Sequence, residues 1–441
     1  MPHFFANNLD FLNNSRQKSG KNFHFLLEAR NLRDNSLLIL AESKSDSHQK
    51  VMLTAQKKGE NFLVKFNKHF KVNSREAIKN ALKDYANLTN ANIISHNLND
   101  NKRESQSKYL LDSQGILEIL DSHKMHESSA DSTHPLAYSA REWESMEGSR
   151  FKNAPKFLEI GFGSGRHILN LARNNPNALI IGLEIYRPAI LQVLRQIELL
   201  NLNNLFIANI DARLLFEVAV RESLNAIFLH FPVPWEKNPQ RRVFSKSFLT
   251  NAIRTLNTQN GRFELVTDSK EYFDFAKNLA RIYKTKTTQN PQNAVISKYE
   301  ARWRKLQKNI YKLEIFPHKK AIFRLLDSLK RFATPLKKML ESKNFADKNN
   351  APNFANLTAN LNAIHSAKYP KVRKKEYFLQ IKDIYKFDGG FVIYAVFGAY
   401  YAPNSAYFIV QENDFKILGD IILSSANKSA IDELKRRILG S

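Results

Sequence analysis

The stretch Glu159-Ile160-Gly161-Phe162-Gly163-Ser164-Gly165 decides how the middle of this 441-residue chain folds. It continues the apolar run Phe157-Leu158 and precedes a helical pattern that begins at His167. A glycine-rich turn between a strand and a helix lets a ligand approach the backbone, because no Cβ atoms block it. The stretch therefore predicts a nucleotide-type ligand at the start of an α/β domain. A purely structural strand–helix turn is the alternative.

Outward from this turn, apolar runs and helical patterns alternate across residues 151–317. Such alternation is typical of a parallel sheet with crossover helices, so we expect a doubly wound α/β domain. The expected strands are Phe157–Ile160, Leu179–Ile185, one ending before Asp211, Ala226–Phe231 and Phe263–Thr267. The expected helices are His167–Arg173 and Pro188–Leu200.

The spacing of the glycines distinguishes between two cofactor classes. They stand at Gly161, Gly163 and Gly165, and the next residue is Arg166. A dinucleotide fingerprint requires glycine where Arg166 stands. The tighter GxGxG pattern after an acid, Glu159, resembles class I methyltransferases that use S-adenosylmethionine (SAM). That resemblance implies a Rossmann-like fold.

Acidic residues at three successive strand ends support SAM over NAD(P). Glu159 suits the cationic amino group of SAM, and Glu184, 19 residues after Gly165, suits the ribose hydroxyls. Asp211, followed by Ala212, suits the adenine amino group. Each acid alone could be a helix N-cap or a solvated loop residue. Together they lie where open α/β sheets bind ligands, so we expect a SAM site.

The segment His230-Phe231-Pro232-Val233-Pro234-Trp235-Glu236-Lys237 follows the fourth expected strand. The prolines on both sides of Val233 stiffen the loop where a methyl acceptor must lie beside the cofactor. Trp235 can stack on a base or cover the site, although a rigid turn with a packed tryptophan is the alternative. Three basic residues can contact phosphates: Lys237, Arg241 and Arg242.

Composition indicates a polyanionic partner. The chain has 67 Lys+Arg against 42 Asp+Glu, a formal charge of +25, which attracts nucleic acid unless it merely solvates the surface. It lacks cysteine, and its 12 histidines show no ligand spacing, so we expect no disulfide and no metal site. No apolar run is long enough to span a membrane, and the first residues lack a signal-peptide pattern. We therefore expect a cytoplasmic protein.

With these motifs the chain resembles the bacterial tRNA (guanine-N7-)-methyltransferases. The family pattern runs LEIGFGxG, GIE, DA, FPDPWxK followed by KRR, then TD and TKFE. The counterparts here occur in the same order within residues 155–316, namely Leu158–Gly163, Gly182–Glu184, Asp211–Ala212, Pro232–Lys237, Thr267–Asp268 and Ser297–Glu300. The resemblance implies transfer of a methyl group from SAM to N7 of guanosine 46 in the tRNA variable loop. One alternative is a methyltransferase whose acceptor is a different RNA base, a protein or a small molecule. The other is a non-catalytic tRNA-binding relative.

The resemblance also implies residue roles. The acceptor loop Pro232–Trp235 contains no certain catalytic residue. Asp268 or Glu300 can accept hydrogen bonds from the N1 and N2 groups of guanine. The implied cofactor-binding residues are Glu159, Gly161, Gly163, Gly165, Glu184, Asp211 and Ala212. The implied substrate-binding residues are Lys237, Arg241, Arg242, Asp268, Ser297, Lys298, Tyr299, Glu300 and Arg302.

Val233 departs from the family pattern, which has aspartate between the two prolines. Valine can neither accept a hydrogen bond nor act as a base. Guanine N7, however, bears no proton and has a free lone pair, so its attack on a methyl group requires no base. Positioning and the electrophilicity of SAM can then carry catalysis. We expect the change to alter contacts with the acceptor, for which Glu236 could compensate, without abolishing the reaction.

The flanking regions fall outside the family pattern. Residues 1–120 are expected to form a β-rich module, with strands at Phe23–Ala29, Leu37–Ala41, Val51–Ala55 and Phe62–Phe66 and a helix from Ser74. Residues 121–150 are expected to be a linker, and 318–441 a basic α+β extension. Its cluster Lys371-Val372-Arg373-Lys374-Lys375-Glu376-Tyr377 suits RNA contact, or is a solvated surface.

Overall fold

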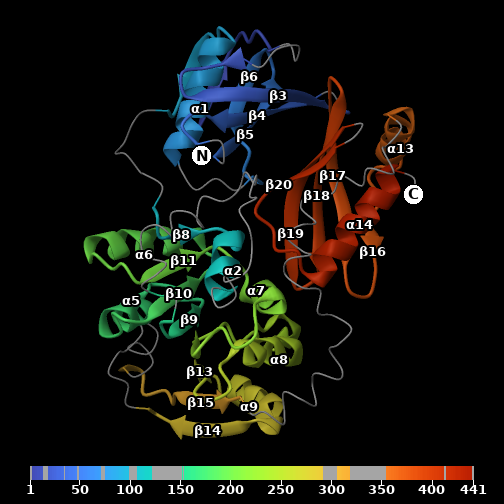
Figure 1. Ribbon diagram of the computed structural model, residues 1–441. Coiled ribbons are helices and arrows are strands. Elements are labelled where there is room, and N and C mark those ends of the chain that lie inside the picture. Colours follow the sequence, from blue (N-terminus) through green and yellow to red (C-terminus); the bar gives the residue numbers. More distant parts are fainter. Residues whose placement is uncertain are drawn as a thin grey trace. The chain divides into compact units, whose positions relative to one another are not determined.

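The computed structural model describes residues 2–12, 18–33, 35–46, 49–70, 75–98, 107–121, 151, 153–291, 305–317, 354–411 and 414–439. The chain divides into two compact units (Figure 1). Unit 1 combines Met1–Gln106 with Thr334–Ser441, and unit 2 is Ser107–Ala333. Among the described residues, no helix has both the length and the apolar character needed to cross a membrane.

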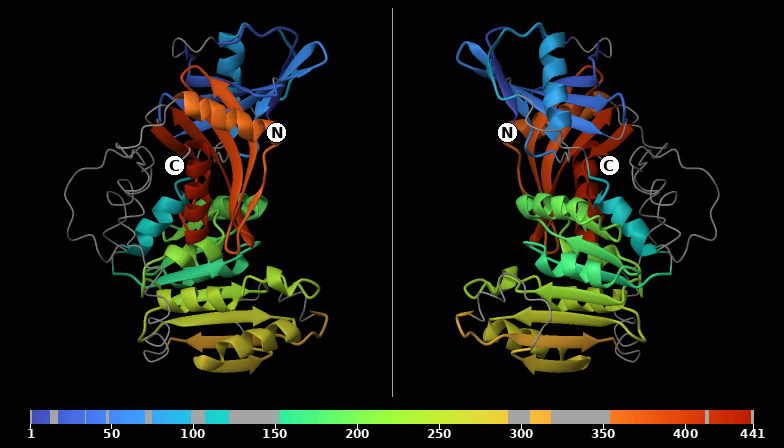
Figure 2. Two further views of the ribbon diagram at one scale, coloured as in Figure 1. Left: turned by 90° about the vertical axis from the view of Figure 1, so that its right-hand side faces the viewer. Right: turned by 90° about the vertical axis from the view of Figure 1, so that its left-hand side faces the viewer.

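Within the described residues, unit 2 is built on an 8-stranded sheet in the order β14-β15-β13-β12-β9-β10-β11-β8. Pairing is parallel from β13 to β8, and β15 runs antiparallel to β13 and β14. Figure 2 shows these strands stacked from the green end of the unit to the gold end. The sheet confirms the predicted doubly wound α/β fold. The strands are β8 (Leu110–Leu111), β9 (Lys156–Ile160), β10 (Leu179–Leu183), β11 (Leu205–Ala208), β12 (Ala226–His230), β13 (Arg262–Thr267), β14 (Lys284–Gln289) and β15 (Tyr311–Phe316).

Helices cover both faces of this sheet, because right-handed crossovers to the two sides of β9 leave on opposite faces. α5 and α6 pack together over β10 and β11 through buried Ile168, Val193 and Ile207. On the other crossover, Phe216 of α7 contacts Phe248 of α8, which contacts Phe263 of β13. The helices are α2 (Ser113–Asp121), α5 (Arg166–Asn174), α6 (Arg187–Leu199), α7 (Ala212–Val218), α8 (Lys246–Thr255) and α9 (Lys270–Leu279), with 3-10 turns η1 (Pro239–Arg241) and η2 (Ala280–Ile282).

The edge strand β8 lies before the region expected to begin the α/β domain. The sequence pattern placed residues 109–120 with the N-terminal module, but Leu110 pairs with Ile207 and Leu111 with Ala208 of β11. Ile116 and Leu120 of the following helix α2 are fully buried. A two-residue strand gives too short a pattern to be assigned from sequence, which explains the difference.

The first half of unit 1 contains the predicted N-terminal strands. The four runs expected from the alternation of apolar residues correspond to β3–β6, and the expected helix corresponds to α1. Its proposed N-cap, Ser74, lies outside the described residues. Tyr85 of α1 is buried against β3, where its hydroxyl donates to Glu28 Oε1 at 2.6 Å. The elements are β1 (His3–Ala6), β2 (Lys18–Ser19), β3 (Phe23–Asn31), β4 (Ser36–Ser43), β5 (Lys50–Lys58), β6 (Asn61–Phe66), α1 (Arg75–Leu88) and β7 (Ile93–His96).

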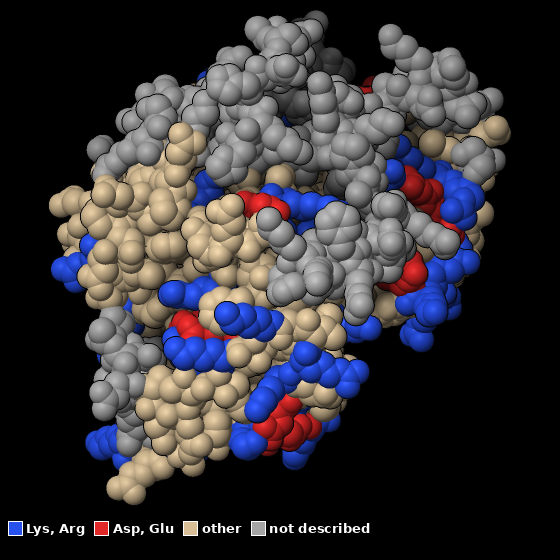
Figure 3. Space-filling view, turned by 60° about the horizontal axis from the view of Figure 1, so that its bottom comes forward, with Lys and Arg blue, Asp and Glu red and all other residues tan. Residues whose placement is uncertain are grey.

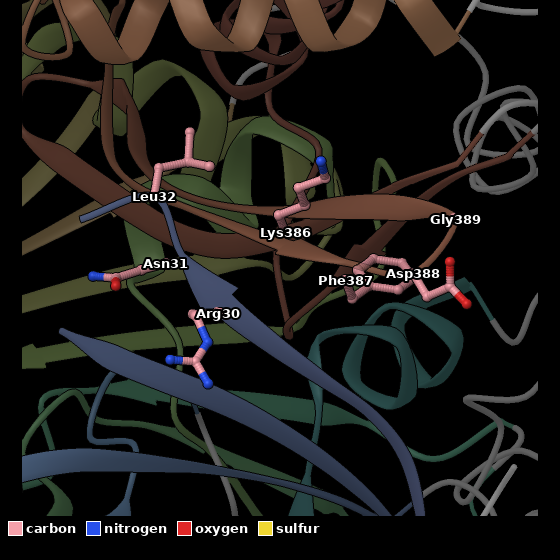
Figure 4. Close-up of a pocket in the computed structure, with 7 residues that line it drawn as sticks. All are labelled: Arg30, Asn31, Leu32, Lys386, Phe387, Asp388 and Gly389. Carbon is pink, nitrogen blue, oxygen red and sulfur yellow. The ribbon is translucent and has the colours of Figure 1, made fainter. Parts of the chain in front are cut away.

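The C-terminal residues continue the same sheet. Its order is β20-β19-β18-β17-β3-β4-β5-β6-β1-β7, with β16 paired to β17 and β2 to β3. The junction pairs Tyr385 with Asn31 and Lys386 with Arg30, beside a shallow hollow that Figure 4 shows. The sequence patterns indicated each flank separately and gave no sign of this pairing. The elements are α13 (Phe354–Ser366), β16 (Val372–Arg373), β17 (Phe378–Phe387), β18 (Gly390–Ala399), β19 (Ala402–Gln411), β20 (Asp414–Leu418) and α14 (Ser425–Leu439).

Candidate active site

The candidate site of unit 2 lies where the strand order reverses. Glu159 of β9 is in register with Gly182 of β10 on one side and with Phe228 of β12 on the other. Crossovers from these strands leave in opposite directions, which opens a crevice at the carboxyl ends where α/β sheets bind ligands. The structure brings together here the predicted residues Glu159 and Glu184 and the loop that follows β12.

The glycine-rich loop joins β9 to α5. Gly161, Gly163 and Gly165 have φ angles of 68°, 51° and 79°, in the left-handed region where other residues are strained. A Cβ on Gly161 would meet no atom within 4 Å, and one on Gly163 only the Gly161 carbonyl oxygen at 4.0 Å. A Cβ on Gly165 would instead approach Val193 Cγ2 to 2.4 Å. The first two glycines therefore leave space for a ligand, and the third lets α5 pack on α6.

Glu184 ties the end of β10 to the glycine loop. Its Oε2 accepts a hydrogen bond from the Gly163 backbone N–H at 3.1 Å. Its Oε1 accepts from the backbone N–H groups of Ile185 at 2.8 Å and Tyr186 at 3.0 Å. These donors fix the carboxylate in one orientation, and Oε2, which accepts only one of them, can still accept a hydrogen bond from a ligand hydroxyl. The neighbouring Ile185 and Tyr186 side chains are exposed beside it.

Asp211 makes a local set of interactions at the start of α7. It is the N-cap residue, and its Oδ1 accepts from the Arg213 backbone N–H at 2.9 Å. The Arg213 guanidinium also donates to both carboxylate oxygens, with Nη2 at 2.6 Å from Oδ2. Asp211 is therefore a helix N-cap, which the sequence analysis gave as the alternative to a cofactor-binding role. Ala212 is buried in the first turn. Contact of Asp211 with adenine stays a prediction.

A row of polar side chains extends from Glu159 and His167, which flank the glycine loop, and the sequence gave a role only to Glu159 among them. His167 Nδ1 is 2.8 Å from Glu159 Oε2, and the rings of His167 and His230 are 4.4 Å apart between centroids. His230 Nε2 is 3.0 Å from Glu264 Oε1, and Lys312 Nζ donates to Glu264 Oε2 at 2.8 Å. We call these five side chains the polar row. It connects the end of β9 to His230, the last residue of β12.

Glu264 is the ionised centre of the polar row. Burial alone would raise its pKa, but the hydrogen bonds and charges of His230 and Lys312 outweigh burial and lower the pKa to about 2. A glutamate between the apolar residues Phe263 and Leu265 of strand β13 was the sequence signal for this network, since a buried carboxylate requires partners. Its partner Lys312 is 48 residues further along the chain, which no local pattern reveals.

Three members of the polar row also have the geometry of metal ligands. Glu159, His167 and His230 each offer one ligand atom, and these atoms lie within 4.8 Å of one another. Each histidine already has a carboxylate at hydrogen-bond distance, which accounts for the arrangement without an ion. The expectation that the protein uses no metal stays a prediction.

The acceptor loop has a strained backbone. Phe231 and Trp235 have φ angles of 49° and 43°, a conformation that non-glycine residues rarely adopt and that is concentrated at functional sites. Val233, between the two prolines, has 61% of its surface exposed, so its side chain is presented to solvent. The Arg241 guanidinium lies 5.0 Å from the Trp235 ring centroid. This stack orients the indole and leaves both groups at the surface.

Arg242 holds the loop from the inside. Only 4% of the residue is exposed, and its Nε donates to the Pro234 carbonyl oxygen at 2.7 Å. Its Nη2 donates to Glu271 Oε1 at 2.6 Å, and the guanidinium packs on the Tyr272 ring. The sequence assigned Arg242 to substrate phosphates, but a buried guanidinium with these partners supports the loop instead. Among the three predicted basic residues, Lys237 and Arg241 are the exposed ones.

Of the remaining predicted substrate residues, the structure describes only Asp268. Asp268 follows β13, is partly exposed, and its Oδ2 is 3.9 Å from Lys308 Nζ. The segment Ser297, Lys298, Tyr299 and Glu300, together with Arg302, lies outside the described residues. The structure therefore places Asp268 near the carboxyl end of the sheet and says nothing of the other five.

Comparison with known proteins identifies the family. A family model described as "Putative methyltransferase" matches residues 153–313. The tRNA (guanine-N(7)-)-methyltransferase of Helicobacter pylori (strain ATCC 700392 / 26695) is 31% identical over 445 aligned positions, covering 100% of this chain and 98% of the relative. The chain belongs to the tRNA (guanine-N(7)-)-methyltransferase family. The enzyme of Campylobacter jejuni subsp. jejuni serotype O:23/36 (strain 81-176) is 38% identical, with 63% of this chain and 67% of the relative covered. Among solved structures, the 16S rRNA methyltransferase KamB is 15% identical with a TM-score of 0.32.

A tRNA (guanine-N(7)-)-methyltransferase transfers a methyl group from SAM to N7 of a guanine in tRNA. The chain is thus an enzyme with SAM as its cofactor and tRNA as its substrate. The open space over Gly161 and Gly163 and the oriented carboxylate of Glu184 fit a ligand that carries ribose hydroxyls. The Helicobacter pylori relative matches 100% of this chain, so it has a counterpart of unit 1 as well as of unit 2.

Proposed function

We propose that the enzyme methylates guanosine 46 in the tRNA variable loop and that its cofactor lies across Glu159, the glycine loop and Glu184. The proposed cofactor position is supported mainly by the open space over Gly161 and Gly163, which lies between two carboxylates at neighbouring strand ends. The choice of guanosine 46 is supported by the ordered family motifs between residues 155 and 316. SAM supplies an electrophilic methyl group, and the protein supplies orientation and charge.

In the proposed arrangement each polar group has a separate task. Glu184 accepts hydrogen bonds from the ribose hydroxyls, and Glu159 attracts the cationic amino group. Asp211 with Ala212 borders the adenine, in which case the Arg213 ion pair must share or release the carboxylate. Gly165 serves packing, because its Cβ position is filled by Val193.

The acceptor side is proposed to work by positioning alone. Guanine N7 has a free lone pair and no proton, so the attack on the methyl group needs no general base. This removes the need for an aspartate at position 233, where the exposed Val233 can contact the edge of the base. His230 is bonded to Glu264, which in turn pairs with Lys312, and it fixes the backbone that leads into the loop. We regard His230 as a positioning residue.

Substrate contacts are proposed for the exposed groups around the loop. Lys237 and Arg241 contact tRNA phosphates, and Trp235 stacks on a base. Asp268 or Glu300 accepts hydrogen bonds from N1 and N2 of guanine, which distinguishes guanine from adenine. The segment Ser297–Glu300 and Arg302 are assigned by the family motif alone. Figure 3 shows Lys and Arg in several groups, with carboxylates beside them, on the face that it brings forward.

A cytoplasmic location is proposed from the tRNA substrate and the lack of cysteine.

Mapping of the methylated nucleoside tests this proposal. The full chain is incubated with methyl-labelled SAM and an unmodified tRNA transcript, which is then digested to nucleosides. We expect 7-methylguanosine, and no label when guanosine 46 is replaced by adenosine. A transcript with another variable-loop nucleotide replaced is the control and should be labelled like the parent. Label that persists without guanosine 46, or appears in another nucleoside, contradicts the proposed acceptor.

A further inference from the structure

We propose that unit 1 carries a tRNA-binding surface of its own, formed by the segment before β17, the β18–β19 turn and the last turn of α14. This inference rests on tRNA being the substrate and does not depend on which guanosine is methylated. We call this surface the basic–tyrosine surface. Its basic residues are Lys371, Arg373, Lys374, Lys375, Arg436 and Arg437, and its exposed aromatic residues are Tyr400 and Tyr401.

Contacts join the first two segments of the surface. The Tyr400 hydroxyl donates to the Lys374 carbonyl oxygen at 3.0 Å, and the Tyr400 ring lies 5.3 Å from the Phe378 ring. Lys371 Nζ lies 5.0 Å from the centroid of the same Phe378 ring. The β18–β19 turn is thereby held against the basic segment. Figure 1 labels β16, β18 and α14 in the red half of the unit.

The end of α14 adds two more cations. Tyr377, at the end of the basic segment, packs against the hydrophobic cluster that contains Leu434 and Ile438 of α14. Arg436 and Arg437 both pair with Glu433, which is only 5% exposed. Their guanidinium groups remain partly open to solvent. The surface therefore has six basic side chains against two carboxylates, Glu376 and Glu433.

The exposed tyrosines distinguish this surface from an ordinary solvated charge run. Tyr400 and Tyr401 are 50% and 47% exposed at a tight turn. Rings beside a group of cations suit an RNA strand, because phosphates meet the cations while unpaired bases stack on the rings. The tRNA loops present such unpaired bases. An acidic protein would use the cations but would have no need of two adjacent half-exposed rings.

The test compares two triple variants of the full chain. The surface variant carries Arg373→Gln, Lys374→Gln and Lys375→Gln. The control carries Lys57→Gln, Lys58→Gln and Lys68→Gln, three exposed lysines on the N-terminal half of the same unit. Both remove three positive charges from solvent-facing positions. Fluorescence anisotropy gives the Kd for tRNA at several salt concentrations, and isothermal titration gives the Kd for SAM.

We expect the surface variant to bind tRNA about tenfold more weakly and its salt slope to fall by about 2, while the control changes little. Binding of SAM should be unchanged in both. Tyr401→Ala should weaken tRNA binding at least about fivefold but leave binding of heparin, a polyanion without bases, unaltered. Equal losses in the two triple variants, or none in the surface variant, would overturn the proposal. A Tyr401→Ala variant that binds tRNA like the parent would overturn the stacking part.

These outcomes are separable from those of the proposed function. Anisotropy reads tRNA binding without methylation, so it remains informative even if the labelled nucleoside lies elsewhere than guanosine 46. Conversely, a surface variant with parental tRNA affinity would leave the mapping of the methylated nucleoside untouched.

Discussion

At the scale of single residues, Val233 is the position where this enzyme differs from the family pattern. Its side chain is exposed between two prolines, so an aspartate fits there without burial of charge. We predict that Val233→Asp changes kcat by less than about threefold, because attack by N7 needs no base. General bases typically contribute 10²–10⁴-fold, so a missing base would give a gain far above that limit. Single-turnover kinetics with saturating SAM measure the effect, and a gain of a hundredfold would contradict positioning alone.

Glu264 is the residue whose environment predicts a pH dependence. Its pKa in the folded chain is about 2, below the value of 4.5 for an unperturbed glutamate. A lowered pKa stabilises the fold above pH 4.5, and this contribution is lost as pH falls toward 2. We predict that Glu264→Gln lowers stability by about 1.5–3 kcal/mol at neutral pH, since it removes a charged hydrogen-bond acceptor.

The difference in unfolding free energy between parent and Glu264→Gln should therefore shrink between pH 5 and pH 3. Denaturant titrations followed by tryptophan fluorescence at the two pH values measure it. A difference that stays constant over this range would show that the Glu264 carboxylate is not the ionised centre of the polar row.

At the scale of elements, the glycines of the loop have two different roles: Gly161 and Gly163 leave room for a ligand, and Gly165 allows α5 to pack on α6. Gly165→Ala would place a Cβ 2.4 Å from Val193 Cγ2 and force α5 away from α6, whereas Gly161→Ala meets no atom. Both substitutions strain a left-handed backbone by a similar amount. We predict that both weaken SAM binding at least tenfold and that Gly165→Ala costs at least about 1 kcal/mol more stability. Thermal unfolding without cofactor gives the comparison, and equal unfolding temperatures would argue against the packing role of Gly165.

The elements of the α/β domain could be predicted because they produce local patterns. Apolar runs such as Leu179–Leu183 and the glycine loop indicate strand and turn within a few residues. The polar row could not be predicted, since Glu159, His230, Glu264 and Lys312 come from four strands and meet only through the sheet register. The buried position of Arg242 was missed for a related reason. A basic run does not reveal which member turns inward to Pro234 and Glu271.

At the scale of the whole molecule, the two flanks form one sheet through Asn31 and Tyr385, although they are far apart in the sequence. Unit 2 is continuous between them and includes β8 and α2. We predict that a fragment of residues 107–333 binds SAM with the Kd of the full chain. A fragment of residues 153–318 should be less stable, because β11 loses its edge partner and the apolar residues packed under α2 become exposed. Circular dichroism melts of the two fragments measure this difference in stability. Equal stability would show that β8 and α2 do not stabilise the domain.

Isothermal titration of SAM into Glu184→Ala tests most directly whether the cofactor binds between Glu159, the glycine loop and Glu184. Glu198→Ala, an exposed glutamate of α6, is the matched control. Loss of a carboxylate that accepts from ribose hydroxyls should raise the Kd for SAM about 10–100-fold, while the control retains the parental Kd. A Glu184→Ala variant that binds SAM as tightly as the parent would contradict the proposed site.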